Sequence, residues 1–131
     1  MSRYEQFTEF RSALNTRILG SDAERGTHPD GSPRTGGTLN TKRFFSLDTK
    51  CYEAGALDVK TKELLGLTAS AVLRCDDCIA YHIDQCCTHD ATDQEIIEAL
   101  DIALIVGGSI LIPHLRRAFE FLDERRDHQS T

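Results

Sequence analysis

The sequence has no tryptophan, one methionine and three prolines, and only 7% of its residues are aromatic. No apolar run approaches the roughly 18 residues of a membrane span, so no such span is predicted. Fifteen Lys and Arg face 21 Asp and Glu, giving a formal net charge of −6, and the basic pairs lie among acids. Nucleic acids and anionic membranes attract clustered cations. The sequence therefore argues against nucleic acid and membrane as partners.

The composition that is present, 40% hydrophobic and 27% charged over 131 residues, is typical of one soluble globular domain covering residues 1–131. Residues 1–20 are charged and helically patterned, unlike a signal peptide. Five cysteines in a chain without an export signal indicate thiol chemistry or metal binding more than structural disulfides. We expect a cytoplasmic protein.

Apolar residues recur at three- and four-residue spacing along most of the chain, and no segment alternates with the period of a strand. The fold class predicted is therefore all-α, a compact bundle of about six helices. Asp58 and Thr92 are expected to cap two of them, Thr92 through a capping box with Glu95. The expected helices cover residues 4–20, 41–55, 59–74, 76–89, 93–106 and 109–125.

Two stretches depart from this regular pattern. Residues 21–40 are rich in glycine and proline and nearly devoid of apolar side chains, which predicts a flexible, non-catalytic insertion. Residues 102–106 are apolar on every side, which in so small a domain indicates burial against another subunit as well as the core. The first helix is expected to pack one apolar stripe on the core.

The main candidate for chemistry is Cys75-Asp76-Asp77-Cys78, followed four residues later by His82. On a helix, Cys78 and His82 share a face, so the imidazole can reach the sulfur. A nucleophilic thiol must become a thiolate, which the histidine and the helix N-terminus favour. Asp76 and Asp77 act in the opposite direction, because negative charge disfavours a neighbouring thiolate.

Spacing alone leaves three interpretations open. The pair could perform dithiol redox chemistry, one sulfur attacking a peroxide or disulfide and the other resolving the product. Cys75, Cys78, His82 and Cys86 could instead hold zinc or another soft metal. The third interpretation is structural, with two buried thiols and a hydrogen-bonded histidine.

The other candidates have plainer interpretations when each is taken alone. Cys51 is expected to be a small buried hydrophobe, and Cys86 and Cys87 are expected to pack in the interior. Of the last two, Cys86 is the better candidate for an accessory redox or metal role, because it shares the His82 face. Glu63 by itself would be a solvated helix carboxylate, and His114 an ordinary surface or interface histidine.

Glu63 followed by Cys75-x-x-Cys78-x-x-x-His82 resembles the signature of the alkylhydroperoxidase D-like, carboxymuconolactone decarboxylase family. The similarity runs from about Gly55 through Gly107-Gly108 into the last helix. The resemblance implies an all-helical protein that assembles into homotrimers or homohexamers, with active sites at or near subunit contacts. It also implies that Glu63 is a buried carboxylate beside the dithiol.

In the redox members of that family, the position matching Cys78 attacks peroxide and the one matching Cys75 resolves it. The residues matching Glu63 and His82 relay the proton. The resemblance therefore implies an antioxidant peroxidase or disulfide oxidoreductase with a redox-active disulfide. It would use a small peroxide or disulfide substrate, an unnamed thiol reductant and neither a metal nor an organic cofactor.

This chain departs from the best-known members in two ways. The alkylhydroperoxidase D proteins have a histidine at the position of Asp77 and a roughly doubled helical layout, so their longer proton relay is not carried over. The true lactone decarboxylases lack the cysteine pair. Lactone chemistry would need Glu63 and His82 but neither thiol, and it remains an alternative, as does a metal-binding or redox-sensing module.

Overall fold

The computed structural model describes residues 1–129 and confirms the all-α class. Within that range it contains seven α-helices and one 3-10 turn, and its β-pairing is limited to an isolated bridge between Thr27 and Pro33. No helix in the described range is long and apolar enough to cross a membrane. The elements are α1 (Arg3–Leu19), α2 (Asp22–Arg25), α3 (Leu39–Cys51), α4 (Val59–Val72), α5 (Asp76–Thr88), α6 (Asp93–Gly107), η1 (Ser109–Leu111) and α7 (Ile112–Gln129).

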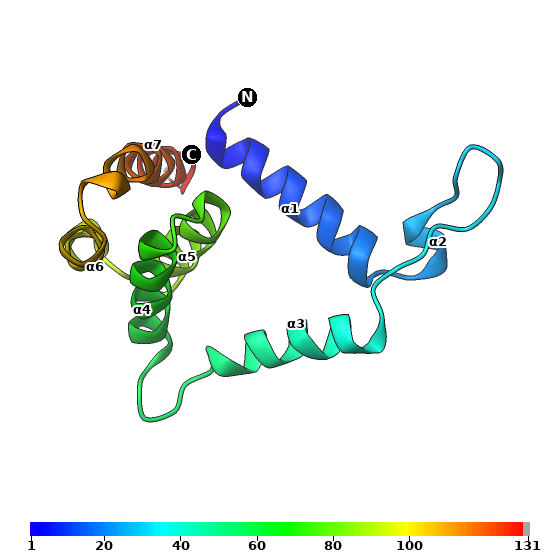
Figure 1. Ribbon diagram of the computed structural model, residues 1–131, viewed down its shortest axis with the longest axis horizontal. Helices are drawn as coiled ribbons and strands as arrows, with labels where there is room; N and C mark the ends of the chain where they lie inside the picture. The colour runs from blue at the N-terminus through cyan, green and yellow to red at the C-terminus, as the bar shows by residue number, and fades with distance from the viewer. Residues whose placement is uncertain (130–131) are drawn as a thin grey trace. The chain divides into compact units, whose positions relative to one another are not determined.

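The chain divides into two compact units. The larger unit comprises Met1–Tyr4 and the chain from Tyr52 onward, and it contains the predicted site. Its helix α4 packs against α5 and α6, and α5 also packs against α7 (Figure 1). The fully buried side chains of this packing include Leu67, Ile83, Leu100 and Phe121, one from each helix. Burial of such side chains is the main favourable term that holds the four helices together.

The helix starts in the larger unit follow the predicted caps. The Asp58 carboxylate accepts a hydrogen bond of 2.7 Å from the Thr61 N–H. Thr92 and Glu95 form the reciprocal capping box, with bonds of 2.9 and 3.1 Å. Each bond satisfies a backbone donor that lacks a partner in the first helical turn. These caps fix where α4 and α6 begin, and with them the direction in which the helices enter the core.

The smaller unit, Glu5–Cys51, is more ordered than its glycine and proline content predicts. Ser21 and Glu24 form a capping box that starts the short helix α2. The Arg25 guanidinium donates to the backbone carbonyls of Arg34 and Gly20, both at 2.9 Å. The expected loop therefore has internal structure. Whether residues 21–40 are flexible, and whether the whole chain is one domain, stay predictions.

The apolar stripes of α1 and α3 are not buried. Neither helix contains a buried residue, and Phe10 and Phe44 are among the exposed large side chains. Tyr4, at the start of α1 and in the larger unit, packs edge-on against the buried Phe121 with ring centroids 5.6 Å apart. Packing of the rest of the first helix on the core stays a prediction. Amphipathic spacing indicates that a helix has an apolar face but does not say which surface covers it.

Candidate dithiol site

The two motif cysteines lie together where α5 begins. Cys75 is the N-cap residue, and its sulfur accepts a hydrogen bond of 3.3 Å from the backbone N–H of Cys78. The two residues are joined as a disulfide pair, with Cα atoms 5.3 Å apart. Cys78 is exposed and Cys75 is half-buried. A reagent in solvent can therefore reach the second sulfur of the pair, and the partial positive charge of the helix N-terminus favours a thiolate there.

A buried carboxylate on α4 meets a buried imidazole on α5, four residues after Cys78. Glu63 on α4 is 2% exposed and His82 on α5 is 7% exposed, and they share a hydrogen bond of 2.8 Å between Oε2 and Nδ1. The solvated interpretation of Glu63 is therefore wrong, because packing of α4 on α5 takes it out of water. Lys60, a neighbour on the same helix, pairs with Glu95 instead. A buried acid–base couple of this kind can accept and return a proton.

The second nitrogen of His82 faces Tyr52, the residue that follows α3. The Tyr52 hydroxyl lies 3.4 Å from Nε2, and the two ring centroids are 5.3 Å apart. Both imidazole nitrogens thus have oxygen partners, Glu63 at Nδ1 and the Tyr52 hydroxyl near Nε2. The expected approach of His82 to the Cys78 sulfur stays a prediction. The sequence analysis missed Tyr52 because 30 residues separate it from His82 and no local pattern links them.

Gly66 allows this close arrangement. A Cβ atom at Gly66 would lie 2.6 Å from Cε1 of His82 and 2.7 Å from the Tyr52 hydroxyl. Both distances are shorter than any ordinary van der Waals contact. The backbone of α4 therefore supports the ring of His82 directly, and only glycine leaves the space for it.

The remaining cysteines divide by burial. Cys86 and Cys87 are buried, which confirms that they pack in the interior. Burial, and next the Glu63 carboxylate, raise the pKa of Cys86 to about 12, and burial also raises the pKa of Cys87. Both therefore remain thiols near neutral pH. Cys51 is exposed, so its expected burial is wrong, because α3 buries none of its residues.

The four residues considered for a metal do not form a ligand set. Cys75 and Cys78 are paired with each other and His82 is bonded to Glu63, while Cys86 is held as a thiol. In residues 1–129 no group of three or more His, Cys, Asp or Glu side chains is placed to hold a metal ion. The spacing of i, i+4 and i+8 along α5 therefore does not by itself assemble the soft-metal site considered above.

A polar cluster links the motif to α7. The Asp76 carboxylate, in the first turn of α5, shares a hydrogen bond of 2.8 Å with Nδ1 of His114 and accepts one of 3.2 Å from Arg117. His114 is half-buried, and its bond to Asp76 gives it a defined partner beside the cysteine pair. The contacts span 38 and 41 residues of sequence, which is why spacing could not reveal them.

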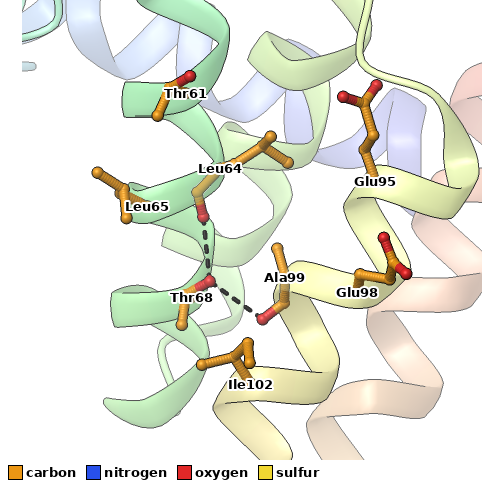
Figure 2. Close-up of a pocket in the computed structure, with 8 residues that line it drawn as sticks. All are labelled: Thr61, Leu64, Leu65, Thr68, Glu95, Glu98, Ala99 and Ile102. Atoms are coloured by element: carbon orange, nitrogen blue, oxygen red, sulfur yellow. Dashed lines mark hydrogen bonds between the residues drawn. The ribbon is translucent and has the colours of Figure 1, made fainter. Parts of the chain in front are cut away.

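A separate groove of about 390 Å³ lies between α4 and α6 (Figure 2). The Thr68 side chain lines the groove, and its hydroxyl donates to the backbone carbonyls of Leu64 on α4 and Ala99 on α6. Leu65 and Ile102 are exposed large hydrophobic residues on its walls. None of the four predicted site residues lines it.

The geometry defines an all-helical protein with a cysteine pair where α5 begins, exposed at Cys78, and a buried carboxylate–imidazole couple between α4 and α5. The family model of the carboxymuconolactone decarboxylase family matches residues 40–122, well over half of the chain, and the chain belongs to that family. This assignment agrees with the resemblance carried by Glu63, Cys75, Cys78 and His82.

Solved structures of proteins named for the same family resemble this chain. Two crystal structures of a family protein from Thermotoga maritima, for which a role in the antioxidative response has been suggested, are 54% and 56% identical to this chain. Their TM-scores are 0.80 and 0.81, and they cover 95% and 97% of this chain and 93% and 98% of their own. A family protein from Legionella pneumophila is 26% identical, with a TM-score of 0.69 over 92% of this chain and 97% of its own. An uncharacterized protein of Cupriavidus necator is 30% identical over 84% of this chain and 93% of its own length.

Proposed function

We propose that this chain is a thiol-dependent oxidoreductase that reduces a peroxide or a disulfide through the Cys75–Cys78 pair. The observation that carries the proposal is the paired sulfurs at the N-terminus of α5, with Cys78 exposed to solvent. The accessible sulfur suits attack on an external oxidant, and the half-buried one suits the resolving step. Membership of the family and the suggested antioxidative role of the Thermotoga protein support the same assignment.

The proposed peroxide reaction has two steps. The Cys78 sulfur attacks one peroxide oxygen, the O–O bond breaks, and a sulfenic acid forms while the leaving oxygen takes a proton to become an alcohol. The Cys75 thiol then attacks the Cys78 sulfur and releases water as the disulfide forms. An external dithiol supplies the two electrons and two protons that restore both thiols.

Glu63 and His82 are proposed as the proton relay of this reaction. They are close, buried and hydrogen-bonded, so a proton removed from the attacking thiol can be held on the couple and returned to the leaving oxygen. Tyr52 completes the arrangement by holding Nε2 of the imidazole. We class Tyr52 as a positioning residue, because it acts through His82.

The test is peroxide-dependent turnover with a dithiol donor. Cys78→Ser should abolish turnover, since the nucleophile is lost. Cys75→Ser should leave one round of oxidation and trap a sulfenic acid on Cys78 that a dimedone probe labels. Cys51→Ser, which removes an exposed cysteine outside the pair, is the matched control and should retain turnover. Full turnover by Cys78→Ser would overturn the proposal.

Lactone chemistry is the second candidate, favoured by the buried Glu63–His82 couple and by the reaction for which the family is named. It would need the couple but neither sulfur. The double variant Cys75→Ser/Cys78→Ser separates the two candidates. Retained conversion of a muconolactone-type substrate by that variant would favour the lactone reaction, and its absence in every variant would favour the dithiol.

We also propose that the protein is a homo-oligomer, a trimer or hexamer, and that it resides in the cytoplasm. Ile105 is 85% exposed in one chain, and Ile102 and Val106 beside it are exposed as well. Together with the apolar walls of the α4–α6 groove, they form a patch that is costly to leave in water. Light scattering of wild type and Ile105→Glu tests the assembly, and a monomeric wild type would contradict it.

A further inference from the structure

The Asp76 carboxylate presents an electrostatic problem for a dithiol. It follows Cys75 directly and stands two residues before Cys78, in the first turn of α5. Negative charge there interacts favourably with the helix N-terminus but disfavours a thiolate on the neighbouring sulfurs. Unless it were offset, Asp76 would therefore make the reduced pair less reactive and the disulfide harder to reduce.

Helix α7 supplies the offset. The two carboxylate oxygens of Asp76 are bound separately, Oδ1 by Nδ1 of His114 at 2.8 Å and Oδ2 by Nη1 of Arg117 at 3.2 Å. Asp77 is the built-in comparison, because it is exposed and has no such partner in the described part of the chain. Of the two carboxylates between the motif cysteines, only Asp76 is bound by α7.

We propose that His114 and Arg117 are positioning residues that hold Asp76 and balance its charge, and that this cluster sets the reduction potential of the Cys75–Cys78 pair. The proposal rests on the dithiol function proposed above and adds a determinant outside the motif. The positive charge of Arg117 balances the negative charge of the Asp76 carboxylate, and the hydrogen bond from His114 restricts rotation of that carboxylate. The cluster thereby offsets the destabilising effect of Asp76 on a thiolate at the neighbouring cysteines.

Charge balance predicts shifts of opposite sign for the two halves of the cluster. Arg117→Gln leaves Asp76 uncompensated, which destabilises the thiolate and shifts the thiol–disulfide equilibrium toward the disulfide. Asp76→Asn leaves Arg117 uncompensated and shifts the equilibrium toward the dithiol. If the cluster were only a mechanical link between α5 and α7, both substitutions would break the same link and shift the equilibrium in the same direction.

The experiment is equilibration of the Cys75–Cys78 pair with reduced and oxidised glutathione at one neutral pH, in a Cys51→Ser background, with redox state read by alkylation and mass spectrometry. Each single substitution should change the equilibrium constant about three- to tenfold, or about 15 to 30 mV for a two-electron couple. Asp76→Asn/Arg117→Gln should return close to the parent value. Arg117→Lys, which keeps the charge, should also stay close to it.

Two control variants isolate the local effect. Arg116→Gln removes one positive charge from the adjacent position of α7, and Asp77→Asn removes the exposed acid without uncovering a cation. Arg116→Gln should leave the potential unchanged. Asp77→Asn should shift it by less than Asp76→Asn does.

The outcomes separate this inference from the proposed function. If the parent Cys75–Cys78 pair is neither oxidised by peroxide nor reduced by a dithiol, the dithiol function fails. If it equilibrates but Asp76→Asn and Arg117→Gln shift the constant in the same direction, or leave it unchanged, the function stands and the charge-balancing role is overturned.

Discussion

Substitution of Gly66 by alanine tests whether the backbone of α4 supports His82. The added Cβ would lie 2.6 Å from Cε1 and 2.9 Å from Nδ1 of that imidazole. The ring cannot retreat freely, because Nδ1 is bonded to Glu63 and Nε2 faces the Tyr52 hydroxyl. We therefore expect Gly66→Ala to displace the imidazole by several tenths of an ångström and to lengthen its 2.8 Å hydrogen bond beyond the usual range.

The magnitude follows from two opposing terms. Alanine in a helix interior is more favourable than glycine by about 1 kcal/mol, whereas overpacking a buried site costs about 1 to 3 kcal/mol. The net loss of stability should thus be about 0 to 2 kcal/mol, which leaves the protein folded. Misplacing a proton-relay group by a fraction of an ångström should still reduce turnover about tenfold or more.

The assay pairs urea unfolding with peroxide-dependent turnover at a fixed protein concentration. Gly55→Ala is the matched control, because its Cβ would meet only the Lys62 ammonium at an ordinary 3.7 Å. We expect normal turnover from Gly55→Ala and reduced turnover from Gly66→Ala. If Gly66→Ala gained about 1 kcal/mol in stability and kept full turnover, the space around His82 would be larger than the structure indicates.

Three further predictions use the buried groups and the exposed cysteine. Burial raises the pKa of Cys86 to about 12, so the Cys86 thiol loses its proton at a lower pH in the unfolded chain than in the folded one. The free energy of unfolding should therefore fall as pH rises from about 9 toward 12. Urea unfolding of Cys86→Ala should show a shallower fall. Glu63→Ala should cost about 1 to 3 kcal/mol by leaving the buried His82 nitrogen unpaired, and Glu63→Gln should cost less; equal losses would contradict the hydrogen-bond account. Exposed Cys51 should react with iodoacetamide in the native protein long before buried Cys86 does, and the reverse order by mass spectrometry would refute these exposures.

The sequence predicted local features of the fold best. The capping residues Asp58 and Thr92 mark helix starts that the structure confirms, because a cap depends on three or four neighbouring residues. The same logic applied to Ser21 and Glu24 would have found α2, which was hidden by the surrounding glycines and prolines. Helix caps can therefore be predicted from a few neighbouring residues.

The site was predicted in part, and the missing part is long-range. His82 was found from its spacing to the cysteine pair and Glu63 through the family signature, and the structure brings the two together in the core. Tyr52 and His114 meet their partners across 30 and 38 residues, through packing that no spacing rule encodes. The exposed stripe of α1 shows the same limit, since its pattern could not indicate what covers it.

The most direct test of the central claim is a thiol count on fully reduced protein before and after one equivalent of peroxide. The dithiol account predicts that two of the five thiols disappear, and that peptide mass spectrometry finds them joined as a Cys75–Cys78 disulfide. Retention of all five thiols, or loss confined to Cys51, would contradict it.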